Sequence, residues 1–338
     1  MNIGEKGYID ADVDPSLDMV SEIAKMRKEK NAIILSHYYQ EGEIQDIADY
    51  VGDSLGLSRQ AAATDADIIV FAGVHFMAET AKILAPEKKV LIPDLSAGCS
   101  LAESCPPDQF REFIGQYPEH TVITYVNTTA EIKAMTDIAC TSGNALEIVR
   151  SLPEGEKIIF APDRNLGNYI QRMTGREMVI WDGACHVHEE FSLERMLELK
   201  MEHPDAKIIA HPECEKPVLI AADYVGSTSQ LLKFVVQDES NKYIVATESG
   251  ILHQMRKENP EKTFIPAPPE DSTCACSNCR FMKLITMKKI YNTLKYELPE
   301  ITLDAEIMRK ARKPIISCLL YTSPSPRDRT RSRMPSSA

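Results

Sequence analysis

The feature that most constrains this chain is a threefold internal repeat with a period of about 87 residues. In each third, a strand-like run ends in polar residues, and a small Gly/Ser/Thr turn then opens a helix. A second strand, another helix and a third strand follow, and each third strand leads to a cysteine. Equivalent positions lie 86 to 94 residues apart: His37, Tyr125 and His211; Ser54, Ser142 and Thr228; and Cys99, Cys185 and Cys279. Such self-similarity predicts one supersecondary unit used three times.

The order of these elements predicts an α/β fold. Strands rich in Val and Ile that alternate with helices are typical of βαβ units, whose parallel sheets are covered by helices on both faces. We therefore expect three homologous three-layer α/β/α domains, each with three strands, at residues 31–117, 118–205 and 206–295. We expect a pseudo-threefold axis to relate them, with the active site at their central junction.

The two ends of the chain lie outside the repeat. Within the N-terminal segment, residues 1–30, apolar spacing predicts a helix over residues 16–30 with Ser16 as its N-cap. Residues 283–313 predict two helices separated at Pro299, so that a C-terminal helix within residues 296–317 closes the structure against the first repeat.

The last 21 residues, 318–338, depart from this pattern. They are rich in Ser, Pro and Arg, and they carry four Arg against one Asp in an otherwise acidic chain. Such a composition buries too little apolar surface to order itself. The segment resembles a translated sequencing adapter or an assembly artefact, and the alternative is a disordered native tail. We assign it no function in either case.

Composition excludes several classes of protein. The hydrophobic content of 43% and the charged content of 26% are typical of a soluble globular protein, and we find no apolar run long enough to span a membrane. The acidic N-terminus does not resemble a signal peptide, so we expect a cytoplasmic protein whose nine cysteines are metal ligands or free thiols. A net charge of −12 argues against nucleic-acid and membrane-surface binding, but it allows a small anionic substrate in a pocket.

The repeat places chemistry at one edge of each predicted sheet. In open α/β sheets, ligands bind beyond the carboxyl ends of the strands. There each repeat delivers a polar strand end, a helix N-terminus with a hydroxyl, and a cysteine. Three helix N-termini directed at one cavity favour phosphate or carboxylate. A single Ser or Thr at a helix start is more often an ordinary N-cap, but repetition at matched intervals favours the binding role.

The cysteines suggest an iron–sulfur cluster. Three thiolates from three repeats do not match a structural zinc site, which has four ligands in close pairs. On a [4Fe–4S] cluster, three cysteines leave one iron open to act as a Lewis acid. A local zinc knuckle at Cys274, Cys276 and Cys279 is the alternative, although no fourth ligand is near in sequence.

The remaining cysteines have other expected roles. Cys105 and Cys140, beside predicted helix starts, and Cys214, after a strand end, are expected to be buried as small hydrophobic residues. Cys274 and Cys276 are expected to be accessory, and Cys318 falls in the segment that we set aside.

Nine segments together resemble one family, quinolinate synthase, in order from about residue 16 to residue 316. They are HYYQ (37–40), GDSLGLS (52–58), PDLSAGCSLAESC (93–105), TYVNTTAEIKA (124–134), APDRNLG (161–167), HPEC (211–214), ADYVGSTSQ (222–230), ATESGIL (246–252) and CSNCRFM (276–282). The resemblance implies an enzyme that condenses iminoaspartate with dihydroxyacetone phosphate to quinolinate, phosphate and two waters, in de novo NAD synthesis. It also implies functional coupling to L-aspartate oxidase or aspartate dehydrogenase.

The resemblance also implies a cofactor and site residues. It implies one [4Fe–4S] cluster per chain, held by the three repeat-equivalent cysteines Cys99, Cys185 and Cys279. The family's C-x-x-C-x-x-C run is C-x-C-x-x-C here, so the resemblance does not extend to a regulatory disulfide in it. The implied catalytic residues are Tyr39, Glu213, His37 and His211. The implied substrate-binding residues are His37, Ser54, Tyr125, Asn127, Ser142, His211, Glu213 and Thr228.

The chemistry of these side chains fits the implied reaction. Tyr, Asn, Ser and Thr donate hydrogen bonds to a carboxylate-rich intermediate at any ordinary pH. His37 and His211 are suited to hold phosphate or a carbonyl oxygen, as cations or as neutral donors. Glu213 beside Tyr39 is suited to acid–base work in isomerisation and dehydration.

Two other functions fit part of the pattern. An iron–sulfur hydro-lyase of a small hydroxy acid would share the open iron, and a non-catalytic zinc-stabilised protein would use Cys274, Cys276 and Cys279. Protein purified without oxygen should be brown in the first case and colourless in the second. The turns GDSLGLS and GSTSQL lack the glycine spacing of a P-loop or a dinucleotide fingerprint.

Overall fold

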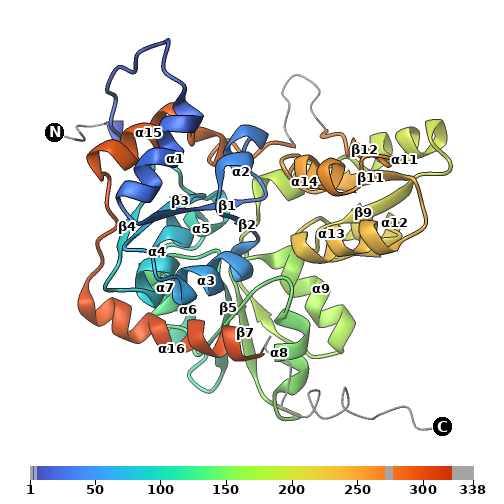
Figure 1. The fold of residues 1–338 in the computed structure, drawn as a ribbon. Helices are drawn as coiled ribbons and strands as arrows, with labels where there is room; N and C mark the ends of the chain where they lie inside the picture. Colours follow the sequence, from blue (N-terminus) through green and yellow to red (C-terminus); the bar gives the residue numbers. More distant parts are fainter. Residues whose placement is uncertain (1–2, 4–5, 271–276, 322–338) are drawn as a thin grey trace, which may run out of the picture.

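The computed structural model describes residue 3, residues 6–270 and residues 277–321. It contains three separate four-stranded sheets, one for each sequence repeat (Figure 1). The strand orders are β2-β1-β3-β4, β6-β5-β7-β8 and β10-β9-β11-β12, so the three sheets share one topology. All neighbouring strands within these sheets are parallel. The predicted α/β class is therefore confirmed.

The strands of each sheet follow the repeat. The first sheet contains β1 (Ala32–His37), β2 (Tyr50–Gly52), β3 (Ile68–Ala72) and β4 (Lys89–Leu91). The second contains β5 (Thr121–Tyr125), β6 (Ile138–Cys140), β7 (Ile158–Ala161) and β8 (Val179–Ile180). The third contains β9 (Lys207–Ala210), β10 (Tyr224–Val225), β11 (Lys242–Ala246) and β12 (Thr263–Pro266).

Each sheet has one strand more than the three that the sequence predicts. The additional strands are β2, β6 and β10, and each lies at a sheet edge beside the first strand of its repeat. They are two or three residues long. Segments this short carry no readable hydrophobic period, so sequence patterning cannot detect them.

Helices connect and cover the sheets. In the first repeat these are α2 (Gly42–Ile47), α3 (Ser54–Ala63), α4 (His75–Leu84), α5 (Ser100–Glu103) and α6 (Pro107–Gly115). The second has α7 (Ala130–Lys133), α8 (Ala145–Ser151), α9 (Arg164–Thr174), α10 (His186–Glu189) and α11 (Leu193–Glu202). The third has α12 (Lys216–Ala221), α13 (Thr228–Gln237), α14 (Ile251–Glu258) and the 3₁₀ turn η2 (Met282–Leu284). Because helices cover both sheet faces, central strands such as β3 are buried at every position.

The N-terminal helix α1 runs over Met19–Glu29 and packs against β1 and the C-terminal helix α15. The predicted helix exists, but its N-cap is Asp18 and not Ser16. The Asp18 carboxylate accepts a hydrogen bond from the Ser21 backbone N–H, which satisfies one of the free donors of the first turn. The hydroxyl of Ser16 instead donates to Asp14, two residues earlier.

Two C-terminal helices, α15 (Met287–Tyr296) and α16 (Ala305–Tyr321), flank Pro299 as predicted. Helix α15 packs on the first repeat, whereas α16 packs against α4, α7 and β6 and so joins the first repeat to the second. The structure differs from the expected boundary at residue 318, because α16 continues to Tyr321. Cys318 is 2% exposed, and its carbonyl oxygen accepts a hydrogen bond from Asn144 Nδ2. Residues 322–338 lie outside the described residues.

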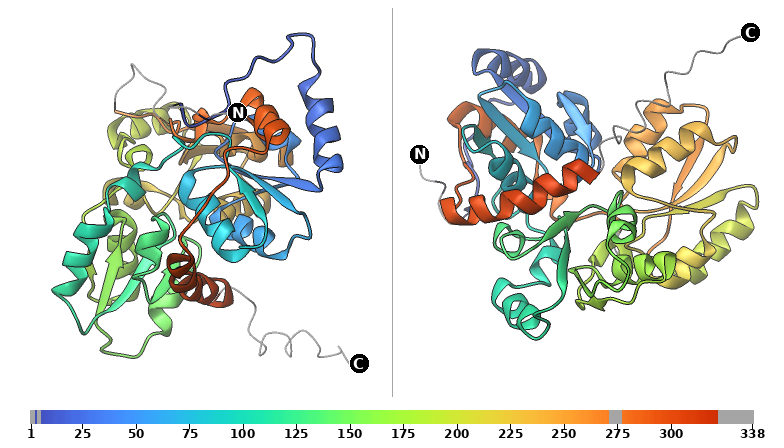
Figure 2. Two further views of the ribbon diagram at one scale, coloured as in Figure 1. Left: turned by 90° about the vertical axis from the view of Figure 1, so that its left-hand side faces the viewer. Right: turned by 90° about the horizontal axis from the view of Figure 1, so that it is seen from below.

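Seen from below, the three sheets and their helices form three lobes (Figure 2, right). One hydrophobic core runs through the first and second repeats and includes α15. The third repeat has its own apolar clusters, one on each side of its sheet. In the part of the chain that the structure describes, no helix combines the length and apolarity needed to cross a membrane.

Candidate active site

A single cavity is lined by side chains from all three repeats. Every residue that the sequence singled out as a metal ligand, catalytic group or substrate contact lies in its wall: His37, Tyr39, Ser54, Cys99, Tyr125, Asn127, Ser142, Cys185, His211, Glu213, Thr228 and Cys279. These residues follow the carboxyl ends of parallel strands, the edge where open α/β sheets bind ligands. The repeat therefore brings its equivalent positions to one place.

The hydroxyl residues lie at or just before helix starts. Ser54 is the first residue of α3, and Thr228 is the first residue of α13. A capping box formed by Ser227 and Gln230 fixes the start of α13. Ser142 lies in the turn before α8, and its Oγ is 3.2 Å from His211 Nε2. Two repeats thus contribute a helix N-terminal hydroxyl, and the third contributes a turn hydroxyl.

The three repeat-equivalent cysteines line the cavity as free thiols. Cys99 and Cys185 are the N-cap residues of α5 and α10, and Cys279 precedes η2. All three are partly exposed. Burial is the main cause that raises their pKa values, to about 12 for Cys99, and neighbouring thiols add to the shift at Cys99 and Cys185. The thiols are therefore protonated until a metal centre binds.

The other described cysteines are structural. Cys105, Cys140 and Cys214 are fully buried, which confirms the prediction for these three. Cys140 is the last residue of strand β6 and does not lie at a helix start. Cys274 and Cys276 lie outside the described residues, so the structure does not test a zinc knuckle there.

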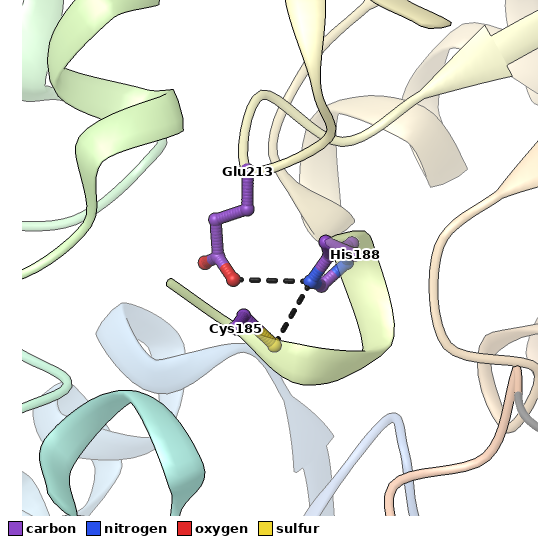
Figure 3. A group of neighbouring side chains, drawn as sticks. All are labelled: Cys185, His188 and Glu213. Atoms are coloured by element: carbon purple, nitrogen blue, oxygen red, sulfur yellow. Dashed lines mark hydrogen bonds and ion pairs between the residues drawn. The ribbon is translucent and has the colours of Figure 1, made fainter. Parts of the chain in front are cut away.

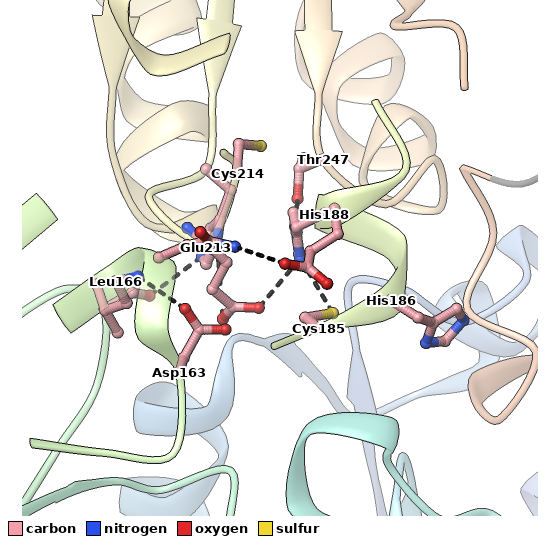
Figure 4. Close-up of polar contacts among 12 residues, drawn as sticks. Asp163, Leu166, Cys185, His186, His188, Glu213, Cys214 and Thr247 are labelled. Atoms are coloured by element: carbon pink, nitrogen blue, oxygen red, sulfur yellow. Dashed lines mark hydrogen bonds and ion pairs between the residues drawn. The ribbon is translucent and has the colours of Figure 1, made fainter. Parts of the chain in front are cut away.

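A chain of polar contacts links Glu213 to Tyr39. Figure 4 labels three of its members, Glu213, His188 and Thr247. His188 Nδ1 is 3.0 Å from Glu213 Oε2, and His188 Nε2 is 2.9 Å from Thr247 Oγ1. Thr247 Oγ1 is in turn 2.8 Å from the Tyr39 hydroxyl, which also lies 3.1 Å from Thr228 Oγ1. Sequence reasoning missed His188 and Thr247. The only signals were the second histidine of H-V-H after Cys185 and the polar residue that ends β11.

The two ends of this chain have opposite protonation preferences. Burial raises the pKa of Tyr39 well above its usual value, although hydrogen bonds with Thr228 and Thr247 oppose the shift. Burial also acts to raise the pKa of Glu213, but His211, His188 and a hydrogen bond from Tyr125 outweigh it and lower the pKa to about 2. At neutral pH the site therefore pairs an ionised carboxylate with a neutral phenol.

The two histidines at equivalent repeat positions, His37 and His211, are neutral donors and not cations. Burial is the main cause that lowers the pKa of His37 and of His211 to about 3 in each case. Both side chains are almost fully buried, and the electrostatic repulsion from His211 adds to the shift at His37. Of the two roles that the sequence allowed, the ligand-free structure favours hydrogen bonding by neutral imidazoles.

A second buried acid, Glu248, holds the loop of Cys279. Its Oε1 accepts a hydrogen bond from the Cys279 backbone N–H at 3.1 Å and lies 3.3 Å from Lys283 Nζ. Lys283 Nζ also donates to the Tyr39 carbonyl oxygen at 2.9 Å. The Glu248–Lys283 pair therefore connects the turn that carries Tyr39 to the loop that carries Cys279. Sequence reasoning did not single out either residue.

The equivalent position in the second repeat also holds a buried acid. Asp163 follows β7 as Glu248 follows β11, and Asp163 lies beside Glu213 (Figure 4). Burial and the proximity of Glu213 raise the pKa of Asp163 well above its usual value, while the backbone N–H groups of Leu166 and Cys185 oppose the shift. Its Oδ2 has no hydrogen-bond partner, and Asn127 Oδ1 is likewise unpaired. Asn127 lies in the cavity wall, so its orphaned acceptor is available to a group that enters the cavity.

Comparisons with known proteins agree with this geometry. The sequence profile of the family described as "Quinolinate synthetase A protein" matches residues 21–319. The quinolinate synthase of Synechococcus sp. is 59% identical over 302 residues, which cover 89% of this chain and 94% of that protein. Those of Synechocystis sp. and Chloroherpeton thalassium are 60% and 54% identical, and each alignment covers 88% of this chain and 93% of the relative. This chain is an enzyme of the quinolinate synthase family.

Proposed function

We propose that this enzyme condenses iminoaspartate with dihydroxyacetone phosphate and releases quinolinate, phosphate and two waters. The observation that carries the proposal is the single cavity that collects donors, an acid–base pair and three free thiols from all three repeats. Each substrate is anionic, and the cavity offers hydroxyl, phenol, amide and neutral imidazole donors for their oxygens. We also propose that a pseudo-threefold axis relates the three sheets, which share one strand order.

The arrangement of the cysteines fits a [4Fe–4S] cluster better than a single ion. Among the described residues, only one group of three potential ligand atoms lies within 4.8 Å of one another, and it contains Cys185 but neither Cys99 nor Cys279. The three sulfurs therefore do not form a close ligand set for one ion. Cys99, Cys185 and Cys279 would hold one such cluster per chain, and the iron without a protein ligand would supply Lewis-acid chemistry.

The remaining residues bind and orient the substrates. Three hydroxyl groups are placed to donate to phosphate or carboxylate oxygens: those of Ser54, Ser142 and Thr228. The helix N-termini at Ser54 and Thr228 also favour an anion. Tyr125 and Asn127 lie at the end of β5, where the free acceptor of Asn127 suits the imine N–H of iminoaspartate. His37 and His211 donate from opposite repeats to carbonyl or phosphate oxygens.

Glu213 and Tyr39 perform the proton transfers. The Glu213 carboxylate, which lies in the cavity wall, is the base that removes a proton from carbon during isomerisation and ring closure. The neutral Tyr39 phenol is the acid that protonates a departing hydroxyl as water. The Glu213–His188–Thr247–Tyr39 hydrogen bonds hold the two groups in their relative positions.

The chemistry implies a setting for the enzyme. An iron–sulfur cluster and free thiols persist in a reducing compartment, so we infer a cytoplasmic location. Iminoaspartate must be supplied by an enzyme that oxidises aspartate, either L-aspartate oxidase or aspartate dehydrogenase. We infer functional coupling to such an enzyme.

An anaerobic assay tests the proposed reaction. Iminoaspartate is generated in place from aspartate, dihydroxyacetone phosphate is added, and quinolinate and phosphate are measured together. We expect equimolar quinolinate and phosphate from brown, cluster-loaded protein. Phosphate release without quinolinate, or no turnover by the fully loaded protein, would contradict the proposal.

The Glu248–Lys283 pair gives a stability prediction. The Glu248 side chain is 1% exposed, so Glu248→Gln leaves the Lys283 ammonium facing a neutral group. We expect a loss of about 3 kcal/mol in the free energy of unfolding, the low end for breaking a buried ion pair, because Lys283 keeps Glu41 at 3.3 Å. The matched control is Glu41→Gln. The Glu41 side chain is 56% exposed, so this substitution should lower the free energy of unfolding by less than about 1 kcal/mol. Urea unfolding of both variants measures this, and equal costs would contradict the interpretation.

A further inference from the structure

Three potential metal ligands of different types converge beside the cavity (Figure 3). His188 Nδ1 lies 3.2 Å from Cys185 Sγ and 3.0 Å from Glu213 Oε2. Cys185 and His188 are three residues apart, at the start and within the single turn of α10, so both side chains point to the same side. Glu213 approaches from the loop after β9.

These separations are close to those of a tetrahedral metal site. Zinc binds sulfur at about 2.3 Å and nitrogen or oxygen at about 2.0–2.2 Å, so neighbouring tetrahedral ligand atoms lie roughly 3.3–3.6 Å apart. The observed separations of 3.2 and 3.0 Å need to open by only a few tenths of an ångström. A set of one sulfur, one nitrogen and one carboxylate oxygen suits a borderline divalent ion such as Zn²⁺ or Co²⁺.

The surroundings of His188 match those of a histidine that binds a metal through Nδ1. Its other ring nitrogen, Nε2, is hydrogen-bonded to Thr247 Oγ1 at 2.9 Å, which fixes the orientation of the ring. The His188 side chain is 2% exposed and that of Glu213 is 3% exposed. The ring therefore cannot rotate away into solvent without breaking this bond.

We propose that Cys185, His188 and Glu213 form a mononuclear site for a zinc-like divalent ion in the cluster-free chain, with the fourth position open to water. Binding converts the Cys185 thiol to a thiolate and releases its proton to solvent. Cys185 cannot serve this ion and a [4Fe–4S] cluster together, so the ion competes with cluster assembly. The competition rests on the proposed cluster role of Cys185, whereas the ion site itself does not.

Cobalt provides the direct test. Full-length, cluster-free protein is titrated with Co²⁺ without oxygen, and thiolate-to-cobalt charge transfer and the visible bands of tetrahedral Co²⁺ are recorded. We expect one Co²⁺ per chain, displaced by Zn²⁺. Each of the substitutions His188→Ala and Glu213→Gln removes a proposed ligand atom. Each should weaken Co²⁺ binding at least tenfold, roughly the effect of losing a ligand. The substitution Thr247→Val removes the partner of His188 Nε2, together with the Thr247 contact to the Tyr39 hydroxyl, but removes no proposed ligand. It should weaken binding about 10-fold or more.

Matched controls separate this site from other thiols. His186→Ala removes the other histidine of the H-V-H segment, whose Nδ1 is bonded to Ser100 Oγ, and should leave Co²⁺ affinity unchanged within about twofold. Cys99→Ala, Cys279→Ala and the double variant Cys274→Ser/Cys276→Ser should also keep binding. Normal binding by folded His188→Ala and Thr247→Val proteins, or loss in Cys99→Ala or Cys279→Ala, would overturn the proposal.

A competition experiment distinguishes the ion site from the proposed reaction. One equivalent of Zn²⁺, added before reconstitution, should lower iron incorporation into the unmodified chain, and Thr247→Val should reduce this effect. If no cluster assembles under any condition, the proposed function fails, but the cobalt spectra still report on the ion site. If cobalt binds as expected and iron incorporation is unaffected by Zn²⁺, the competition is wrong.

Discussion

Replacement of Cys99, Cys185 or Cys279 by alanine is expected to abolish both the brown chromophore and quinolinate formation. Each residue comes from a different repeat and lines the same cavity as a free thiol. Because a cluster held by three thiolates has no protein ligand to spare, the loss of one leaves two irons without a protein ligand. Iron and acid-labile sulfide per chain, the visible absorbance and anaerobic turnover measure the effect.

Two buried cysteines provide the controls for this experiment. Cys105 and Cys140 are fully buried, and neither lies in the wall of the cavity. Cys105→Ala and Cys140→Ala remove only a sulfur from an apolar environment, so we expect normal cluster content and a loss of about 1 kcal/mol of stability. A brown and active Cys185→Ala protein would remove Cys185 from the ligand set.

The repeat allowed much of this fold and site to be predicted from the sequence. A unit used three times puts His37, Tyr125 and His211, or the three cysteines, at equivalent places in equivalent sheets. Parallel strands align their carboxyl ends, so equivalence in sequence becomes proximity in space once the sheets face one cavity. The family resemblance added roles to positions that the repeat had already selected.

Residues without equivalents in the other repeats could not be found in this way. His188 and Thr247 connect Glu213 to Tyr39 through contacts between segments that are 59 residues apart. Glu248 has an acidic counterpart in Asp163, but the first repeat has Val74 at the matching position. Contacts between such distant segments depend on how the third repeat is placed against the other two. Local sequence patterns carry no information about that placement.

The protonation states of the buried histidines and the end of helix α16 also could not be predicted from the sequence. The preference of His37 and His211 for the neutral form follows from their burial, because desolvation disfavours the cation. The extension of α16 to Tyr321 follows from the apolar side that Cys318 presents to the second repeat. Because the composition of residues 318–338 was judged as a whole, the sequence did not reveal that residues 318–321 belong to helix α16.

Loss of proton transfer at Glu213 or Tyr39 is the other large expected effect. Glu213→Gln removes the base but keeps the shape of the side chain, and Tyr39→Phe removes the acid but keeps the ring. We expect kcat to fall by about 10²–10⁴-fold in each variant, the usual contribution of general acid–base catalysis. Both variants should assemble the cluster and bind quinolinate, because neither substitution removes a cysteine.

A matched substitution separates chemistry from binding. Ser142 Oγ lies 3.2 Å from His211 Nε2 in the same cavity, and the proposal gives its hydroxyl a role in substrate binding and none in proton transfer. A contact made equally in ground and transition states raises affinity without raising kcat, so Ser142→Ala should mainly increase KM. Anaerobic kcat and KM, normalised to cluster content, decide between these outcomes. If Glu213→Gln behaved like Ser142→Ala, with near-normal kcat and weaker binding, then Glu213 would orient substrate and the base would have to be another group. Asp163, the buried acid beside it, would not be that base, because burial is the main cause that raises its pKa and favours its protonated form.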